Sequence, residues 1–145
     1  MTRTRESQLA SAVLMIRPVR FESNPLTAAS NRFQGKNDSD PAGQQTAAAN
    51  EFDALVTALR DAGIEVIVID DVAEPHTPDS IFPNNWISTH ADGRVVLYPM
   101  EAENRRIERR MDIVDYLGSV AGRQISELVD LSSHEDSGHH LEGTG

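Results

Sequence analysis

Two neighbouring side-chain amides, Asn84 and Asn85, stand in the segment Phe-Pro-Asn-Asn-Trp, just before residues that favour a β-strand. Polar residues that follow a proline are typical of a turn, so one interpretation is a structural loop. The other interpretation is a binding site, because an amide at the mouth of a strand can donate to and accept from a small polar ligand. The residue types leave both interpretations open.

Two further segments carry polar groups that could contact a ligand. Glu142 lies in Leu-Glu-Gly-Thr-Gly, where it is either a surface-loop residue or an acid beside glycines that let the backbone approach a ligand. Gly143 and Gly145 do not form a nucleotide-binding fingerprint, which needs a third glycine and a helix. Segment 24–34, which includes Asn31, is rich in amides and hydroxyls and is typical of a capped turn or short helix.

The segment from His134 to Glu142 resembles a metal cluster by its composition. The two-histidine zinc motif places its histidines four apart on a helix, so that both face one ion. Here His134 and His139 are five positions apart, with Gly138 between them. We therefore expect no metal site, although a metal-binding loop at His134–His140 is a hypothesis that a zinc titration can dismiss.

Composition bounds the remaining possibilities. The 145 residues fit about one domain, and 39% hydrophobic with 25% charged residues indicate a globular chain. A net charge of −10 disfavours binding to nucleic acid. The absence of Cys excludes disulfides, Cys-ligated metals and a thiol nucleophile within the chain. The apolar run Ala12–Ile16 is too short for a signal sequence or membrane span, so we expect a cytoplasmic protein without membrane contact.

The first half of the chain predicts a strand, a helix and a second strand. The apolar run Ala12–Ile16, closed by Pro18, favours a buried strand. Residues 20–46 carry proline, glycine and many polar side chains, which predicts a long loop. From about Thr46, apolar residues at helical spacing predict a helix that a C-cap glycine, Gly63, ends. A second apolar strand follows at Ile64–Ile69.

The second half repeats this pattern behind a hairpin. Residues 86–90 and 95–98 flank Asp92-Gly93, a strong signal for a tight turn between two strands. Apolar residues then recur at helical spacing, which predicts one helix ended by Gly118 or Gly122, and residues 125–129 predict another strand; the helical positions are Ile107, Met111, Val114 and Leu117. The pattern indicates modular α/β architecture.

Four segments occur in an order that resembles one known family. They are Leu14–Pro18, Asn24-x-x-Thr27-Ala28-x-x-Asn31-x-Phe33-Gln34, Phe82–Ser88 and Leu141–Gly145. Together they resemble the amidinotransferase/arginine deiminase superfamily, and within it the arginine-deiminase-related proteins of the citrulline-utilisation hydrolase type. The resemblance covers residue 12 or so to the end. It implies an α/β pentein fold, a five-bladed fan of ββαβ units around a central site.

The resemblance also implies a domain larger than this sequence. A complete member of the superfamily is roughly twice as long, so we expect residues 1–145 to form the N-terminal part of a single domain that continues beyond the chain end. The chain would supply about two ββαβ units and the start of a third.

The resemblance implies a chemistry as well. In the family, a Cys thiolate attacks the guanidine or ureido carbon of an arginine-like substrate, and a His acts as general acid and base. The family's first substrate-binding position falls on Asn85, and the acid that orients the His falls on Glu142. Asn84, Asn31 and Arg17 are further candidate substrate-binding residues, Arg17 for a substrate carboxylate.

The resemblance places the catalytic His and Cys beyond Gly145. The histidines of this sequence that we considered therefore receive no catalytic role; they are His90, His134, His139 and His140.

Two departures from the family pattern shape the functional prediction. No Cys is present, so the chain as given should not turn over substrate. Asn85 is an amide where relatives often place a carboxylate, and a buried guanidinium needs a negative partner. An amide instead matches the N–H and C=O edges of a ureido group. We therefore predict a preference for a ureido substrate such as citrulline over arginine.

The sequence thus favours part of a Cys-dependent hydrolase of non-peptide C–N bonds in a guanidino or ureido amino acid. The alternative is a non-catalytic ligand-binding protein or truncated scaffold, which the missing Cys favours. No metal or organic cofactor is implied. The expected partners are a small amino-acid substrate and, as an option, a second copy of the chain in a homo-oligomer.

Overall fold

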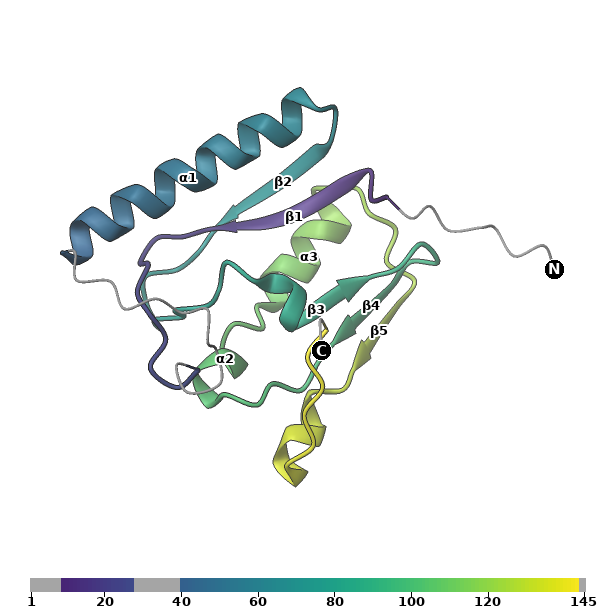
Figure 1. Ribbon diagram of the computed structural model, residues 1–145. Coiled ribbons are helices and arrows are strands. Elements are labelled where there is room, and N and C mark those ends of the chain that lie inside the picture. The colour runs from purple at the N-terminus through teal and green to yellow at the C-terminus, as the bar shows by residue number, and fades with distance from the viewer. Residues whose placement is uncertain (1–8, 28–39, 144–145) are drawn as a thin grey trace.

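A computed structural model describes residues 9–27 and 40–143, in which strands and helices alternate (Figure 1). Asn31, one of the predicted site residues, lies outside the described residues. Strand β1 (Ala12–Arg17) pairs in parallel with β2 (Glu65–Asp70), in a register that sets Ala12 opposite Glu65. Helix α1 (Pro41–Asp61) connects them. The strand–helix–strand order predicted for this half is confirmed.

Helix α1 begins at Pro41, so the prediction that it begins near Thr46 was wrong. The Asp40 side chain accepts a hydrogen bond of 2.6 Å from the Gly43 N–H and caps the helix, and Pro41 takes the first helical position. Asp40, Pro41 and Gly43 carry loop signals that here start a helix instead. At the other end, Gly63 has φ of 82° and its N–H bonds to the Arg60 carbonyl, which confirms the predicted C-cap.

The second half forms a complete ββαβ unit. Strand β3 (Ile87–Thr89) pairs antiparallel with β4 (Arg94–Leu97), and β4 pairs in parallel with β5 (Glu127–Asp130) across helix α3 (Met111–Ser119). The predicted hairpin is confirmed, since Gly93 has φ of 86° and its N–H bonds to the His90 carbonyl.

The helix predicted across residues 107–117 corresponds to α3 alone, which begins only at Met111. The short α2 (Glu103–Arg106) ends before Ile107, and α3 starts afresh after Arg110, which is extended. Ile107 and Met111 are 47% and 45% exposed, so they do not belong to the buried face. That face consists of Ile113, Val114 and Leu117. The break matters because it turns two charged side chains, Arg105 and Glu108, toward the interior.

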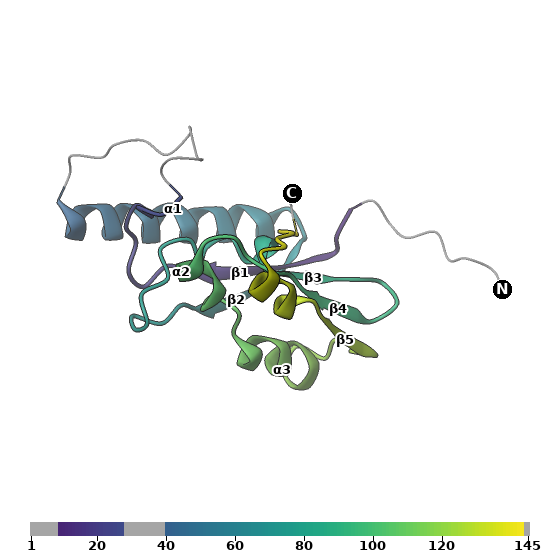
Figure 2. The same ribbon diagram turned by 90° about the horizontal axis from the view of Figure 1, so that it is seen from below.

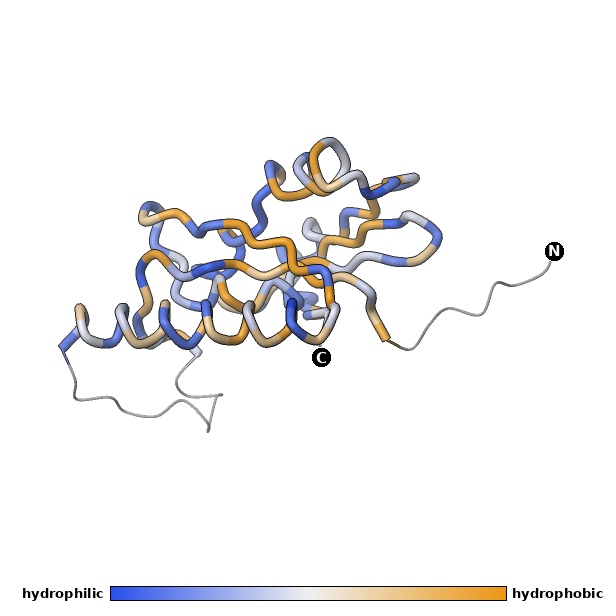
Figure 3. The backbone as a smooth tube through the Cα atoms, turned by 90° about the horizontal axis from the view of Figure 1, so that it is seen from above, coloured by the Kyte–Doolittle hydropathy of each residue, from blue (hydrophilic) through white to orange (hydrophobic). Residues whose placement is uncertain are grey.

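Helices α1 and α3 lie on opposite faces of the β1–β2 layer (Figure 2). Strands β1 and β2 consist mostly of apolar residues, whereas α1 alternates apolar and polar positions along its length (Figure 3). Only Val56 of α1 is buried, and Leu55 is 51% exposed. No helix in the part of the chain that the structure describes is long and apolar enough to cross a membrane.

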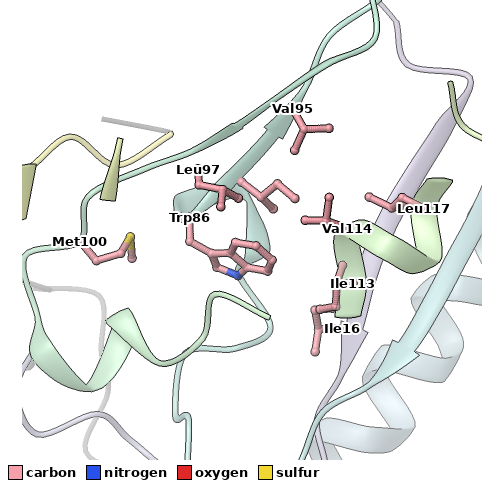
Figure 4. Close-up of a cluster of buried hydrophobic side chains, with 9 residues drawn as sticks. Ile16, Trp86, Val95, Leu97, Met100, Ile113, Val114 and Leu117 are labelled. Carbon is pink, nitrogen blue, oxygen red and sulfur yellow. The ribbon is translucent and has the colours of Figure 1, made fainter. Parts of the chain in front are cut away.

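The main core lies between β1, the β3–β4 hairpin and α3 (Figure 4). It contains Ile16, Trp86, Ile87, Val95, Leu97, Met100, Ile113, Val114 and Leu117. Trp86 is 1% exposed and is the largest of these side chains. Trp86 directly follows a short 3₁₀ turn, Pro83–Asn85, and its burial therefore anchors that turn against the core.

Candidate functional site

An open cleft of about 850 Å³ lies where four parts of the chain meet: the segments after β1 and β2, the region of α2 and the last described residues. Its lining consists of Leu26, Thr27, Asp79, Phe82, Asn85, Glu101, Ala102, Glu103, Arg105 and Glu142. The cleft brings together two residues that the sequence marked as candidates, Asn85 and Glu142. It is large enough for an amino acid.

Asn85 and Glu142 are joined by a direct hydrogen bond. The Asn85 Nδ2 donates to Glu142 Oε2 over 2.5 Å, across a sequence separation of 57 residues. Asn85 ends the 3₁₀ turn, where its own backbone N–H bonds to the Phe82 carbonyl over 3.2 Å. The predicted turn is confirmed, and it also presents an amide to the cleft.

Backbone hydrogen bonds also hold this pair together. The Gly143 N–H donates to the Asn85 carbonyl over 2.8 Å, and the Leu141 N–H donates to the Pro99 carbonyl over 3.0 Å. A Cβ at Gly143 would collide with the Asn84 carbonyl oxygen and lie 3.0 Å from the Tyr98 ring. Glycine is therefore required for the close approach that places Glu142 beside Asn85.

Replacing Gly143 with alanine should lower the free energy of unfolding by about 1–3 kcal/mol, because the Asn84 backbone cannot yield as a flexible side chain would. Urea unfolding followed by tryptophan fluorescence measures this through Trp86. Gly118→Ala is the matched control, because its Cβ would lie 3.4 Å from Ile125 in ordinary contact and alanine suits α3. Equal stability of the two variants would contradict the close approach.

A partly buried ion pair holds the segment that leads to Glu142. Arg109 donates from Nη1 and Nη2 to both Glu135 carboxylate oxygens over 2.9 and 2.5 Å, and the Met100 N–H donates to Glu135 Oε2 over 2.9 Å. Burial acts to raise the pKa of Glu135, but the Arg109 and Met100 hydrogen bonds and the Arg109 and Arg106 charges outweigh it and lower the pKa. Glu135 therefore stays ionised and ties its segment to the region before α2.

Arg105 is the charged centre of the site, and the sequence analysis did not identify it. It is 6% exposed, and its Nε and Nη2 donate to the two Glu108 carboxylate oxygens, each over 3.1 Å. Its Nη1 lies 3.6 Å from Glu142 Oε2 and its Nε lies 3.7 Å from Asp79 Oδ2. Arg105 thus connects a buried acid with two acids of the cleft. The i,i+3 spacing of Arg105 and Glu108 was the available signal.

Asp79 is held in place by the segment that follows β1. The Asn24 Nδ2 donates to Asp79 Oδ2 over 2.6 Å, and the Asn104 Nδ2 donates to Asn24 Oδ1 over 2.8 Å. Asn24 is 1% exposed. Two members of the amide- and hydroxyl-rich segment, Asn24 and Thr27, therefore lie at the site: Asn24 supports Asp79 and Thr27 lines the cleft.

The cleft is strongly acidic. Four carboxylates, Asp79, Glu101, Glu103 and Glu142, line it together with one arginine, Arg105. Such a lining attracts a cation, because each carboxylate near the surface of a cleft contributes a negative potential that solvent only partly screens.

Glu108, behind Arg105, is 3% exposed, and burial raises its pKa. The Arg105 hydrogen bonds and charge oppose this effect, and the charges of Asp79 and Asp71 add to it, so that the pKa reaches about 7. Glu108 therefore titrates within the physiological range.

Two other predicted site residues, Arg17 and Asn84, lie apart from the cleft. Arg17 donates to both carboxylate oxygens of Asp53 on α1, over 2.9 and 2.8 Å, and does not line the cleft, so its position gives the predicted carboxylate-binding role no support. The exposed Asn84 donates its Nδ2 to Asn85 Oδ1 over 3.2 Å and also lies outside the lining. Within residues 9–27 and 40–143, no group of three His, Asp or Glu side chains could hold a metal ion.

The fold defines the class of protein. It is similar to the fold of a solved dimethylarginine dimethylaminohydrolase variant, crystallised as an adduct with S-methyl-L-thiocitrulline. That structure matches with a TM-score of 0.59 and 16% identity over 93% of this chain. The chain therefore has part of a pentein fold, and with the family match given next, the predicted fold and the predicted amidinotransferase/arginine deiminase superfamily are both confirmed.

The family can be stated more closely. The model of a family described as N,N dimethylarginine dimethylhydrolase, eukaryotic, matches residues 17–145, and the chain belongs to this family. The chain spans 45% of the length of the solved relative. A search of curated proteins found no match. The more specific citrulline-utilisation branch and the N-terminal position of residues 1–145 in a longer domain stay predictions.

Proposed function

We propose that these residues form part of the substrate cleft of a hydrolase that breaks a C–N bond of a guanidino amino acid, as an arginine deiminase does. The observation that carries the proposal is the Asn85–Glu142 pair inside an acidic cleft. In such a reaction water replaces the amine on the guanidinium carbon, the amine leaves, and a ureido group remains. The family match to a dimethylarginine hydrolase supports the guanidino class.

The residues described here supply binding and orientation. Asp79 and Glu142 offer negative charge to a guanidinium, and Asn85 holds Glu142 in place. The 145 residues contain no Cys, so the nucleophile of the proposed reaction has to come from outside them. By resemblance, Glu142 would orient the His that activates this nucleophile. We propose a cytoplasmic location for the enzyme, as expected from the sequence.

The structure gives the amide at Asn85 a second explanation. Its Nδ2 donates to Glu142 over 2.5 Å and its Oδ1 accepts from Asn84 over 3.2 Å, so both ends of the amide already have partners within the protein. A carboxylate at this position would face the Glu142 carboxylate at hydrogen-bond distance and repel it. The acidic partner alone is thus a reason for an amide, and a cationic substrate suits the four carboxylates of the cleft better than a neutral ureido substrate.

Turnover by the complete gene product tests the proposal. We expect release of dimethylamine from N,N-dimethyl-L-arginine or of ammonia from L-arginine, and slower reaction of L-citrulline, each measured by quantifying the released amine. Asn85→Asp should lower the rate by roughly tenfold or more, because the carboxylate pair can no longer ionise fully. If citrulline is the better substrate, the ureido preference predicted from the amide holds instead.

The missing Cys supports a second candidate, a binding protein without catalysis. The same cleft would then bind a guanidino or ureido amino acid and release it unchanged. Calorimetric binding of L-arginine with no amine release from any of the three substrates would establish this candidate and overturn the hydrolase.

A further inference from the structure

We propose that Glu108 is a specificity-determining residue: it holds and neutralises Arg105, and so decides how much of the negative charge of Asp79 and Glu142 is left for a cationic substrate. This inference rests on the proposed guanidino-binding function. It concerns a residue that lies behind the cleft and does not line it, so Glu108 acts through Arg105 and not by contact with the substrate.

The geometry shows why Arg105 transmits the effect. Its guanidinium makes two hydrogen bonds of 3.1 Å to Glu108, but it lies 3.6 Å from Glu142 and 3.7 Å from Asp79, beyond hydrogen-bonding distance. Arg105 therefore donates its two short hydrogen bonds to Glu108 from one edge of its planar guanidinium group. The two cleft carboxylates form only longer ion pairs with Arg105, without hydrogen bonds.

The ionisation state of Glu108 determines how strongly Arg105 opposes the binding of a substrate cation. When Glu108 is ionised, it cancels the charge of Arg105, and the carboxylates of Asp79 and Glu142 are free to attract a guanidinium. When Glu108 is protonated, Arg105 keeps its full positive charge beside those carboxylates and competes with the substrate cation. A neutral ureido group has no net charge and experiences little of this change.

Burial makes Glu108 suitable for this role. It is 3% exposed and lines a second pocket of about 300 Å³ together with Trp86. The charged groups that face it come from three elements: Arg105 of α2, Asp71 and Asp79 from the segment after β2, and Arg110 and Asp112 at the start of α3, with Glu74 on the same pocket. Since the pKa of Glu108 is raised to about 7, its charge changes between pH 6 and 8.

A matched ligand pair isolates the effect. L-Arginine and L-citrulline share the same α-amino acid end and differ in a cationic guanidinium and a neutral ureido group, so the ratio of their dissociation constants reports on the charge of the cleft. We expect this ratio to shift toward arginine by roughly tenfold as pH rises from about 6 to about 8, measured calorimetrically on the complete gene product.

The variant Glu108→Gln keeps an oxygen acceptor for Arg105 but cannot ionise. Its ratio should be independent of pH and should equal that of the unchanged protein at low pH, with relatively stronger citrulline binding. Asp115→Asn is the control, because it removes an exposed carboxylate on α3, away from the cleft, and should leave the pH profile unchanged. A structural role alone for Glu108 would weaken both ligands equally and leave their ratio constant.

The outcomes separate the inference from the proposed function. Binding of both amino acids with parallel pH profiles in the unchanged protein would overturn the inference alone, whether or not Glu108→Gln folds. Binding of neither would overturn the proposed function and the inference with it. A shift of the ratio in the unchanged protein that persists in Glu108→Gln would assign the titration to another group and would also overturn the inference.

Discussion

Replacement of Glu142 by glutamine is expected to lower kcat of the complete gene product by about 10²–10⁴-fold while the protein stays folded. An acid that orients a catalytic histidine contributes on this scale, because the amide cannot stabilise the imidazolium that forms as the histidine takes up a proton. Glutamine keeps the oxygen that accepts the 2.5 Å hydrogen bond from Asn85, so the local structure has no reason to rearrange. Steady-state kinetics with the best guanidino substrate measures the effect.

A second carboxylate of the same segment, Asp136, provides the control for Glu142→Gln. Asp136→Asn removes an exposed carboxylate from the same segment without touching the cleft, and should retain the rate. If Glu142→Gln raised KM at unchanged kcat, Glu142 would act through substrate binding alone and would not orient a catalytic group. The proposed orienting role would then be wrong.

The second large effect concerns stability. Arg105→Met should lower the free energy of unfolding by about 3–5 kcal/mol at pH 8, since it leaves Glu108 buried without its cationic partner. The cost should shrink at pH 5. Without Arg105, the pKa of Glu108 rises further above its unfolded value, and an acid with a raised folded pKa contributes stability that is present at low pH and lost as pH rises.

Urea unfolding at the two pH values measures this difference. The double variant Arg105→Met/Glu108→Leu should recover most of the stability at pH 8, because no buried charge remains. Arg106→Met is the matched control. Its guanidinium donates to the carbonyls of Met100 and Glu101 and lies 3.8 Å from Glu135 Oε1, but Glu135 keeps its hydrogen bonds from Arg109, so the loss of Arg106 should cost about 1 kcal/mol. Equal losses for Arg105→Met and Arg106→Met at pH 8 would contradict the assignment.

The sequence predicted the elements whose local signals agree with one another. The β3–β4 hairpin follows from Asp92-Gly93 between two apolar runs, and the end of α1 follows from Gly63. The start of α1 was missed because Pro41 and Gly43 carry loop signals, and only the Asp40 cap decides between loop and helix. The break between α2 and α3 was missed because helical periodicity continues through Ile107 and Met111, which turn out to be exposed.

The site was predictable only in part. Asn85 and Glu142 were found through a resemblance to a known family, and no local pattern indicated that their side chains meet across 57 residues. Arg105 was missed because an Arg-rich stretch that alternates with acids is typical of a solvated helix face. Its burial depends on the helix break and on Glu108, which a periodicity argument does not resolve.

The hydrogen bond from the Gly143 N–H to the Asn85 carbonyl has a consequence for how the cleft comes into being during folding. This hydrogen bond closes a loop that contains the whole of β3, β4, α3 and β5. Closing that loop costs less entropy once those elements have folded, so we expect the contact to form after them. We infer that the hairpin and α3 form the nucleus and that Glu142 arrives late. Amide exchange should therefore show the Gly143 amide opening at lower free energy than that of Val95, which lies in the central strand of the β3–β4–β5 sheet.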